Sequence, residues 1–396
     1  MSVRLSDRIK TLELWGQDLS LSSSLLKGDE SRIISSRGKE EEDRISLLPE
    51  SLLCHILSFL TTKEAVCTSV LSSRWRNLWK WAPTLELETA DFTNDEACVD
   101  FIYQKLQTFQ TLREFNLCIN FSKSKTDASL YEPCLGKLIN RKIQRLVVDC
   151  YRDIEIPLTL TSCESLVCVS LYSVKLNAFE SLFLPCLKIM YLEDVVFPPR
   201  GDNNWFLDTP RLEYLTLIDN QFKGFKIVAM SDSVKVDVDV DFELKTQVTQ
   251  HDMTERNIVY DLLKNFSAVG VLTLSWQTLK LIYRLQQMNP LPKFHGLTRL
   301  RAIISLNASL EVLPIVLESC PNLKHLSLEL VKDDDPEAVV TKISDVLSFC
   351  LVSSLEYVEM ESPVVTDEAT EEKLVRYFLE NARSLKKLSR SSFVTV

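Results

Sequence analysis

Cysteine and histidine are the residue types in this sequence that could support nucleophilic or metal chemistry. The chain has eleven cysteines and four histidines, and both types are scattered along it. No C-x-x-C pair and no H-E-x-x-H run occurs, so the ligand spacing of zinc fingers, thioredoxin-like redox sites and helical zinc proteases is missing. Cys54 and His55 are adjacent, but adjacent residues on a helix do not face each other. We therefore expect no metal site and no cysteine nucleophile.

Glycine spacing excludes the common nucleotide-binding loops. The chain has eight glycines, and no two of them lie closer than ten positions. The dinucleotide motif G-x-G-x-x-G and the phosphate loop G-x-x-x-x-G-K need closer glycines, because their bare backbones must approach a phosphate. The hydrolase motif G-x-S-x-G is excluded by the same spacing. The sequence thus predicts no catalytic residues and no cofactor.

Three aspartates near the middle of the chain alternate with valines. They are Asp237, Asp239 and Asp241, within the segment 234–242. A calcium-binding EF-hand loop would need a glycine after Asp241 and a glutamate at its twelfth position, but the sequence has Phe242 and Val248 there. The strict alternation instead predicts a strand with one buried face and one face in water.

Composition and charge restrict the class of protein. Of 396 residues, 45% are hydrophobic and 25% are charged, which is typical of a globular protein with about two to three domains. The formal net charge is −10, and an acidic chain repels phosphate, so we expect no nucleic-acid partner. No apolar run reaches about 18 residues, so we expect no membrane span. The odd cysteine number without a signal peptide predicts reduced thiols in an intracellular protein of the nucleus or cytoplasm.

The first 87 residues divide into a tail and a helical segment. Residues 1–42 are rich in polar residues and we expect weak order there. In residues 43–87, an apolar residue recurs every four positions, which predicts an amphipathic helix: Leu48, Leu52, Ile56 and Leu60. Residues 61–64 match a capping box that starts a second helix, and a third short helix would include Trp75. A unit this small cannot bury all of its apolar side chains, so it should dock on a partner.

From residue 112 onwards, a short apolar template recurs along the chain. It consists of an apolar residue, two variable residues, an apolar residue, one variable residue and a third apolar residue. Copies that start at 143, 166, 187 and 212 follow each other after 23, 21 and 25 residues. This period predicts a leucine-rich-repeat solenoid over residues 88–343, in which each copy forms a strand with its apolar side chains inward. Later copies start at 269, 297, 323 and 355, and the longer spacing predicts inserted helices or irregular loops.

The C-terminal segment, residues 344–396, has the pattern of a strand, a helix and a second strand. Residues 355–360 alternate between apolar and other side chains, as in a half-buried strand. Acidic residues at 367 and 368 favour the start of a helix, whose apolar face would include Leu374 and Phe378. A strand that contains Leu388 would then cap the solenoid.

Residues 43–84 resemble the F-box of plant proteins. The similarity lies in five stretches at matching offsets: 43–53, 56–60, 62–66, 68–72 and 74–79. Thr61 stands where such F-boxes commonly have proline. The repeats resemble those that follow F-boxes in this family, and residues 344–390 resemble the FBD module through 350–351, 354–356 and 374–382. The resemblance implies an α/β fold with an N-terminal three-helix F-box, an irregular leucine-rich-repeat solenoid and an FBD-like C-terminal cap.

The resemblance also implies a partner for the helical segment. An F-box binds the Skp-type adaptor of an SCF (Skp–cullin–F-box) ubiquitin ligase and, through it, cullin. The adaptor-binding positions that carry over are these eight: Leu48, Pro49, Leu52, Ile56, Leu60, Val66, Val70 and Trp75. The alternative for each is a side chain that only holds the helices together, because the apolar stripe of a helix is usually core.

The repeats would then bind an unknown target protein. Residues that flank the last two apolar positions of each template copy point away from the core, and six of them are candidate contacts: Tyr172, Tyr191, Tyr214, Arg299, Arg301 and His325. Tyrosine and arginine dominate binding hot spots because each combines a large contact area with a polar group. The alternative is ordinary cross-strand pairing on a wet sheet face.

Three functions are consistent with these observations. The favoured one is a non-catalytic substrate receptor of an SCF-type ubiquitin ligase, which brings a target close to the conjugating enzyme. The second is a leucine-rich-repeat scaffold or small-ligand sensor that acts without cullin assembly. The third, a cysteine hydrolase, has no recognisable third catalytic group.

Overall fold

The computed structural model describes the following residues: 45, 47–108, 112–119, 128–155, 163–176, 181–197, 205–218, 225–229, 231–240, 260–285, 291–305, 312–331, 354–363 and 368–393. The chain divides into two compact units, Met1–Pro49 and Glu50–Val396. The tail expected over residues 1–42 lies outside the described residues, and so does the start of the C-terminal segment at 344–353. All elements named below belong to the second unit.

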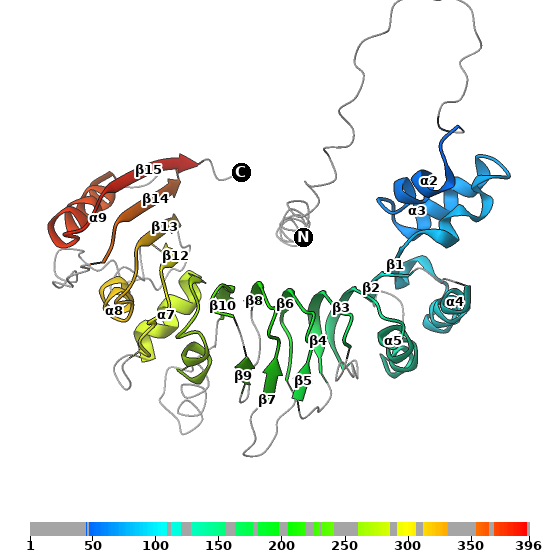
Figure 1. Ribbon diagram of the computed structural model, residues 1–396, viewed down its shortest axis with the longest axis horizontal. Helices are drawn as coiled ribbons and strands as arrows, with labels where there is room; N and C mark the ends of the chain where they lie inside the picture. The colour runs from blue at the N-terminus through cyan, green and yellow to red at the C-terminus, as the bar shows by residue number, and fades with distance from the viewer. Residues whose placement is uncertain are drawn as a thin grey trace, which may run out of the picture. The chain divides into compact units, whose positions relative to one another are not determined.

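The second compact unit begins with a group of short helices, which we call the helical unit (Figure 1). It contains the α-helices α2 (Glu50–Leu57) and α3 (Thr62–Cys67) and the 3-10 helices η3 (Thr68–Val70) and η4 (Trp75–Trp81). The segment around Trp75, expected as a third helix, therefore adopts the tighter 3-10 form. Buried apolar side chains from α2, α3 and η4 form its core: Leu53, Leu57, Ala65, Trp75, Leu78 and Trp79.

Twelve of the described strands form one sheet, and each pairs in parallel with its neighbour. In spatial order they are β1 (Thr84–Glu88), β2 (Glu114–Ile119), β3 (Arg145–Glu155), β4 (Cys168–Lys175), β6 (Ile189–Glu193), β8 (Tyr214–Ile218), β10 (Lys235–Asp239), β11 (Val271–Leu274), β12 (Arg299–Ser305), β13 (His325–Val331), β14 (Tyr357–Pro363) and β15 (Lys387–Phe393). The spatial order follows the chain order, as expected when successive repeats stack on each other.

The apolar template positions face the core. In all nine copies, from the one that starts at Leu112 to the one that starts at Leu355, every template residue is buried. The aspartate–valine segment also forms a strand, β10, in which Val236 and Val238 are buried while Lys235 and Asp237 are exposed. Position 241 lies outside the described residues. The period of the template thus predicted both the strands and the side chains that they bury.

Helices cover one side of the sheet (Figure 1). They are α4 (Asp95–Thr108), α5 (Glu132–Ile139), α7 (Trp276–Leu285), α8 (Val312–Glu318) and α9 (Glu368–Asn381). Two 3-10 helices, η5 (Thr89–Asp91) and η6 (Ala128–Tyr131), precede α4 and α5 in the chain. Helices α7 and α8 fall in the intervals where the template spacing lengthens. We call the sheet face opposite these helices the open face; it carries the residues that alternate with the template positions.

Two parts of the sheet architecture go beyond the sequence-based expectation. Strand β1 lies inside the segment 43–87, so strand pairing begins before the first template copy at 112. A second, three-stranded parallel sheet contains β5 (Ser181–Phe183), β7 (Trp205–Asp208) and β9 (Phe225–Ala229). It lies on the same side of the large sheet as the helices (Figure 1).

The described residues contain neither a candidate membrane span nor a candidate metal site. Among these residues, no helix has the length and apolar character needed to cross a membrane. The same residues contain no group of three or more histidine, cysteine, aspartate or glutamate side chains that could hold a metal ion.

Candidate interaction surfaces

The helical unit exposes many apolar side chains. Leu52 and Ile56 are both exposed and lie four residues apart on α2, so they share one helix face. Further exposed apolar side chains of this segment follow α2 or belong to α3, η3 and the turn after it: Phe59, Val66, Val70 and Leu71. Val70 is 88% exposed and Phe59 75% exposed. Large exposed apolar patches are typical of surfaces that bind a partner or a ligand.

The eight expected adaptor-binding positions divide by burial. Pro49, Leu52, Ile56, Val66 and Val70 are exposed, and Leu48 and Leu60 are half-buried. Trp75 differs, because it is only 6% exposed and packs in the core of the helical unit. Two further exposed side chains, Phe59 and Leu71, were not among the expected contacts, although both belong to the apolar pattern of the sequence.

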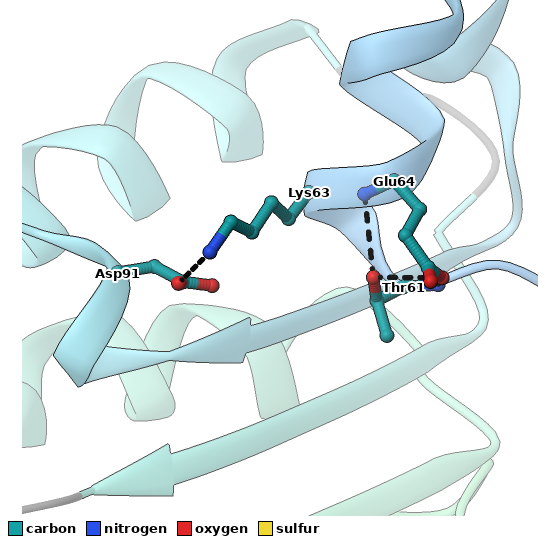
Figure 2. A network of polar contacts seen from close by, with 4 residues as sticks. All are labelled: Thr61, Lys63, Glu64 and Asp91. Carbon is teal, nitrogen blue, oxygen red and sulfur yellow. Dashed lines mark hydrogen bonds and ion pairs between the residues drawn. The ribbon is translucent and has the colours of Figure 1, made fainter.

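Helix α3 is fixed to the first strand of the sheet. The buried hydroxyl Oγ1 of Thr62 accepts a hydrogen bond from the backbone amide of Glu86 in β1 at 2.8 Å. Lys63 reaches from α3 to Asp91 in η5, and its Nζ lies 2.5 Å from the carboxylate (Figure 2). This ion pair raises the pKa of Lys63. Two contacts thus set how the helical unit attaches to the sheet.

The same region contains the expected capping box. Thr61 has extended backbone angles, and its hydroxyl accepts a hydrogen bond from the amide of Glu64 at 3.3 Å (Figure 2). The amide of Thr61 donates in return to the Glu64 carboxylate at 3.0 Å. These reciprocal bonds satisfy donors that a helix start would otherwise leave unpaired, so α3 begins at a defined residue.

An aromatic contact joins η4 to α4. The Trp79 ring stacks on Phe101 with centroids 6.4 Å apart and the ring planes 6° from parallel. The ammonium group of Lys105 lies 3.8 Å from the centroid of Trp79. Burial of this ammonium lowers the pKa of Lys105, as expected for a cation taken out of water. Together with the Thr62 and Lys63 contacts, this packing fixes the position of the helical unit against β1, η5 and α4.

Two of the expected target-binding tyrosines come together on the open face. The rings of Tyr172 and Tyr191 lie 5.0 Å apart between centroids, and Val147 completes the cluster. The hydroxyl of Tyr191 donates to the carboxylate of Glu193 at 2.9 Å. The tyrosines are only 6% and 7% exposed, so most of their area already contacts this protein.

The other four expected target-binding residues lie further along the sheet. Tyr214 accepts a hydrogen bond from Nζ of Lys235 at 3.1 Å. His325 stacks on Tyr357 with centroids 4.5 Å apart and ring planes 9° from parallel. Both arginines are exposed, and Arg301 pairs with Glu329 at 2.7 Å and has Glu361 at 3.9 Å.

Comparison with known proteins matches three family models to this chain. The F-box domain model covers residues 45–86, a leucine-rich-repeat model covers 186–206 and the FBD model covers 349–389. An F-box/FBD/LRR-repeat protein of Arabidopsis thaliana is 52% identical over 88% of this chain and 84% of its own length. The chain belongs to the F-box/FBD/LRR-repeat protein family. An FBD-associated F-box protein of the same plant is 42% identical over 88% of this chain and 90% of its own length.

The three matched regions correspond to distinct parts of the structure. The F-box match spans the helical unit and extends into β1, the strand that bonds to Thr62. The leucine-rich-repeat match begins just before β6 and ends in β7. The FBD match includes β14, α9 and the start of β15. F-box domains generally bind Skp-type adaptors, and the exposed apolar side chains described above lie within the F-box match.

The cysteines of this family member are poor candidates for nucleophiles where the structure places them in the core. Burial raises the pKa of Cys98 to about 12 and that of Cys134 to about 11, and it also raises the pKa of Cys150. Reactive cysteines have the opposite shift, because the thiolate is the attacking species. Cys54 donates a long hydrogen bond to the carbonyl of Leu78, and its pKa is also raised by burial. The geometry therefore gives no support to the Cys54–His55 pair.

Proposed function

We propose that this chain is the substrate receptor of an SCF-type ubiquitin ligase. The F-box would bind a Skp-type adaptor, which connects it to cullin, and the repeats would bind the target protein. The main support is that the F-box match coincides with the helical unit. This unit buries some apolar side chains in its own core and exposes others. The chain itself would be non-catalytic and would act in the nucleus or cytoplasm.

The proposed adaptor contact uses the exposed apolar side chains of the F-box. Leu52 and Ile56 on one face of α2 would contribute most of the contact, and the exposed Val66 and Val70 would add to it. Leu48, Pro49 and Leu60 would contribute smaller areas. The burial of Trp75 favours an indirect role, in which Trp75 supports the helices that carry the contact residues.

The proposed target contact is the open face of the sheet. Tyr214, Arg299 and His325 would offer accessible groups, whereas the buried pair Tyr172 and Tyr191 would shape the surface beside them. Arg301, already paired with Glu329, would contribute less charge. In this proposal, residues 88–343 form a repeat solenoid between a three-helix F-box at 43–87 and an FBD-like cap at 344–396, with 1–42 as a tail or linker.

A fixed junction would matter for this function. A receptor accelerates ubiquitin transfer by raising the effective concentration of the target near the conjugating enzyme, and that gain depends on geometry. The contacts of Thr62, Lys63 and Trp79 hold the F-box at a defined orientation to the strands of the same unit. They support a receptor that positions its target over one that only tethers it.

The competing function is a repeat-based scaffold or small-ligand sensor that acts without cullin. Co-purification of the full-length chain with a Skp-type adaptor separates the two. We expect the wild-type chain to bring down the adaptor, and the double variant Leu48→Asp with Pro49→Ala to lose it while its repeat strands stay folded. Unchanged adaptor capture by the double variant, or no capture by the wild type, would support the scaffold instead.

A further inference from the structure

A row of basic and aromatic side chains crosses the open face near the start of the strands. Seven strands of the large sheet, β8 and β10 to β15, each contribute one residue to this row through in-register pairing. The residue from β11 is Val271. The other six are what we call the basic row: Tyr214, Lys235, Arg299, His325, Tyr357 and Lys387. None of its positions is acidic, although the whole chain has a net charge of −10.

On β10, β13 and β14 the acidic side chains of the open face lie further along the strands than the basic row. Asp237 and Glu359 are two positions beyond the basic row, and Glu329 and Glu361 are four positions beyond it. Arg301 lies among them and is held by Glu329 at 2.7 Å. The sheet face therefore changes from positive to negative along the strand direction.

The positive charges of the basic row remain accessible. Arg299 and Lys387 are exposed, and no carboxylate of the described residues pairs with either of them. Lys235 is also exposed, and its ammonium group donates a hydrogen bond to the hydroxyl of Tyr214. Two acidic residues directly precede members of the row, and both are paired: Glu213 with Lys188 at 2.9 Å and Glu356 with Lys386 at 2.7 Å.

The aromatic members separate the cations along the row. His325 and Tyr357 stack with their planes 9° apart, between Arg299 on one side and Lys387 on the other. Both rings are half-buried and add apolar contact area between the cations. The row thus combines apolar contact area with charges at fixed intervals.

We propose that the basic row binds an extended acidic segment of the target protein. This inference deepens the receptor function proposed above and rests on it. Strands of one sheet lie about 4.8 Å apart, which places Lys235 and Arg299 about 10 Å apart and Arg299 and Lys387 about 14 Å apart. An extended chain advances about 3.1 to 3.4 Å per residue. The matching segment therefore has carboxylates about three and then four to five positions apart.

The carboxylates beyond the row give the site its selectivity. If the bound acidic segment were displaced along the strands, its carboxylates would come close to Asp237, Glu329 or Glu361. Like charges in close contact repel each other, so this placement is disfavoured. A neutral segment would lose the ion pairs, and a basic one would be repelled by the row itself. The two bands of opposite charge thus specify both the sign of the ligand and its path across the strands.

A peptide titration with the full-length chain tests this proposal. The probe is a fluorescent peptide of about twelve residues, rich in alanine and proline, with three glutamates at the stated spacing. The matched peptide has glutamine at the same three positions. The test variants are Arg299→Glu and Lys387→Glu, and the control variant is Lys373→Glu, which makes the same charge change at an exposed position on α9. Arg299→Gln and Lys387→Gln serve as milder variants if a reversal disturbs folding.

The expected result is selective binding of the glutamate peptide to the wild-type chain. Each reversal in the basic row should weaken binding about three- to tenfold, as for a partly exposed ion pair, and Lys373→Glu should leave it unchanged. Equal binding of the two peptides, or equal losses in all three variants, would overturn the proposal. Binding that appears only after removal of residues 1–43 would also overturn it and assign the row to the chain's own acidic run, Glu40 to Asp43. Adaptor capture by the same preparations reports on the receptor function separately.

Discussion

The side chain of Thr62 on α3 and the backbone of Glu86 on β1 are joined by a 2.8 Å hydrogen bond that links the helices of the F-box to the first strand of the large sheet. Strand β1 lies at the end of the large sheet, so its outer amides have no neighbouring strand to bond with among the described residues. Thr62 supplies an acceptor for one of them. The residue directly after the helix cap thus fixes α3 to β1.

Thr62→Val should weaken this junction while keeping the shape of the side chain. The amide of Glu86 would lose its acceptor, which costs about 1–3 kcal/mol of the free energy of unfolding. Urea unfolding measures that loss, and hydrogen exchange at the Glu86 amide should become faster. Thr62→Ser keeps the hydroxyl and serves as the control; similar exchange rates in the two variants would contradict the assigned role of this bond.

The stability of the protein should fall in alkaline solution. Burial raises the pKa of Cys98 to about 12 and of Cys134 to about 11, while thiols of the unfolded chain lose their protons near pH 8.5. At a pH between the unfolded-state and folded-state pKa values, the folded state binds more protons than the unfolded state. The free energy of unfolding therefore decreases as the pH rises, by up to about 1.4 kcal/mol per pH unit for each thiol. Urea unfolding between pH 7 and 10 measures this slope. Cys98→Ala with Cys134→Ala should flatten it, and an equally steep slope in that variant would refute the explanation.

Two glycines should respond in opposite ways to the same substitution. A Cβ at Gly296, just before β12, would lie 2.1 Å from the backbone oxygen of Ala268, so Gly296→Ala should cost about 1–3 kcal/mol of stability. A Cβ at Gly136 in α5 would meet no atom within 4 Å, and alanine should stabilise that helix by about 0.5–1 kcal/mol. Thermal unfolding of the two variants decides this, and a stabilising Gly296→Ala would show that the close approach is not strict.

The repeat core was predictable from the sequence because its signal is local. Every template residue is buried, and the capping box at Thr61 and Glu64 forms as its pattern indicates. The second sheet escaped prediction because β5, β7 and β9 lie between the template copies and do not repeat the template themselves.

The open face was less predictable because its pairing is non-local. Arg299 and Arg301 look equivalent in sequence, yet only Arg301 meets Glu329 and Glu361, which arrive from β13 and β14. Tyr172 and Tyr191 were expected as accessible contacts, and their mutual packing makes them mostly buried. Trp75 shows the same limit in the F-box, since its position in the stripe does not reveal that it faces inward.

Adaptor affinity is the most direct test of the receptor function. A titration of a Skp-type adaptor against the full-length chain should give binding that Ile56→Asp weakens at least about a hundredfold, because a charge at the centre of an apolar contact loses its water. Leu379→Asp introduces the same kind of charge at a 64% exposed leucine on α9 and should leave the affinity unchanged. Equal affinities for the wild type and Ile56→Asp would contradict the account.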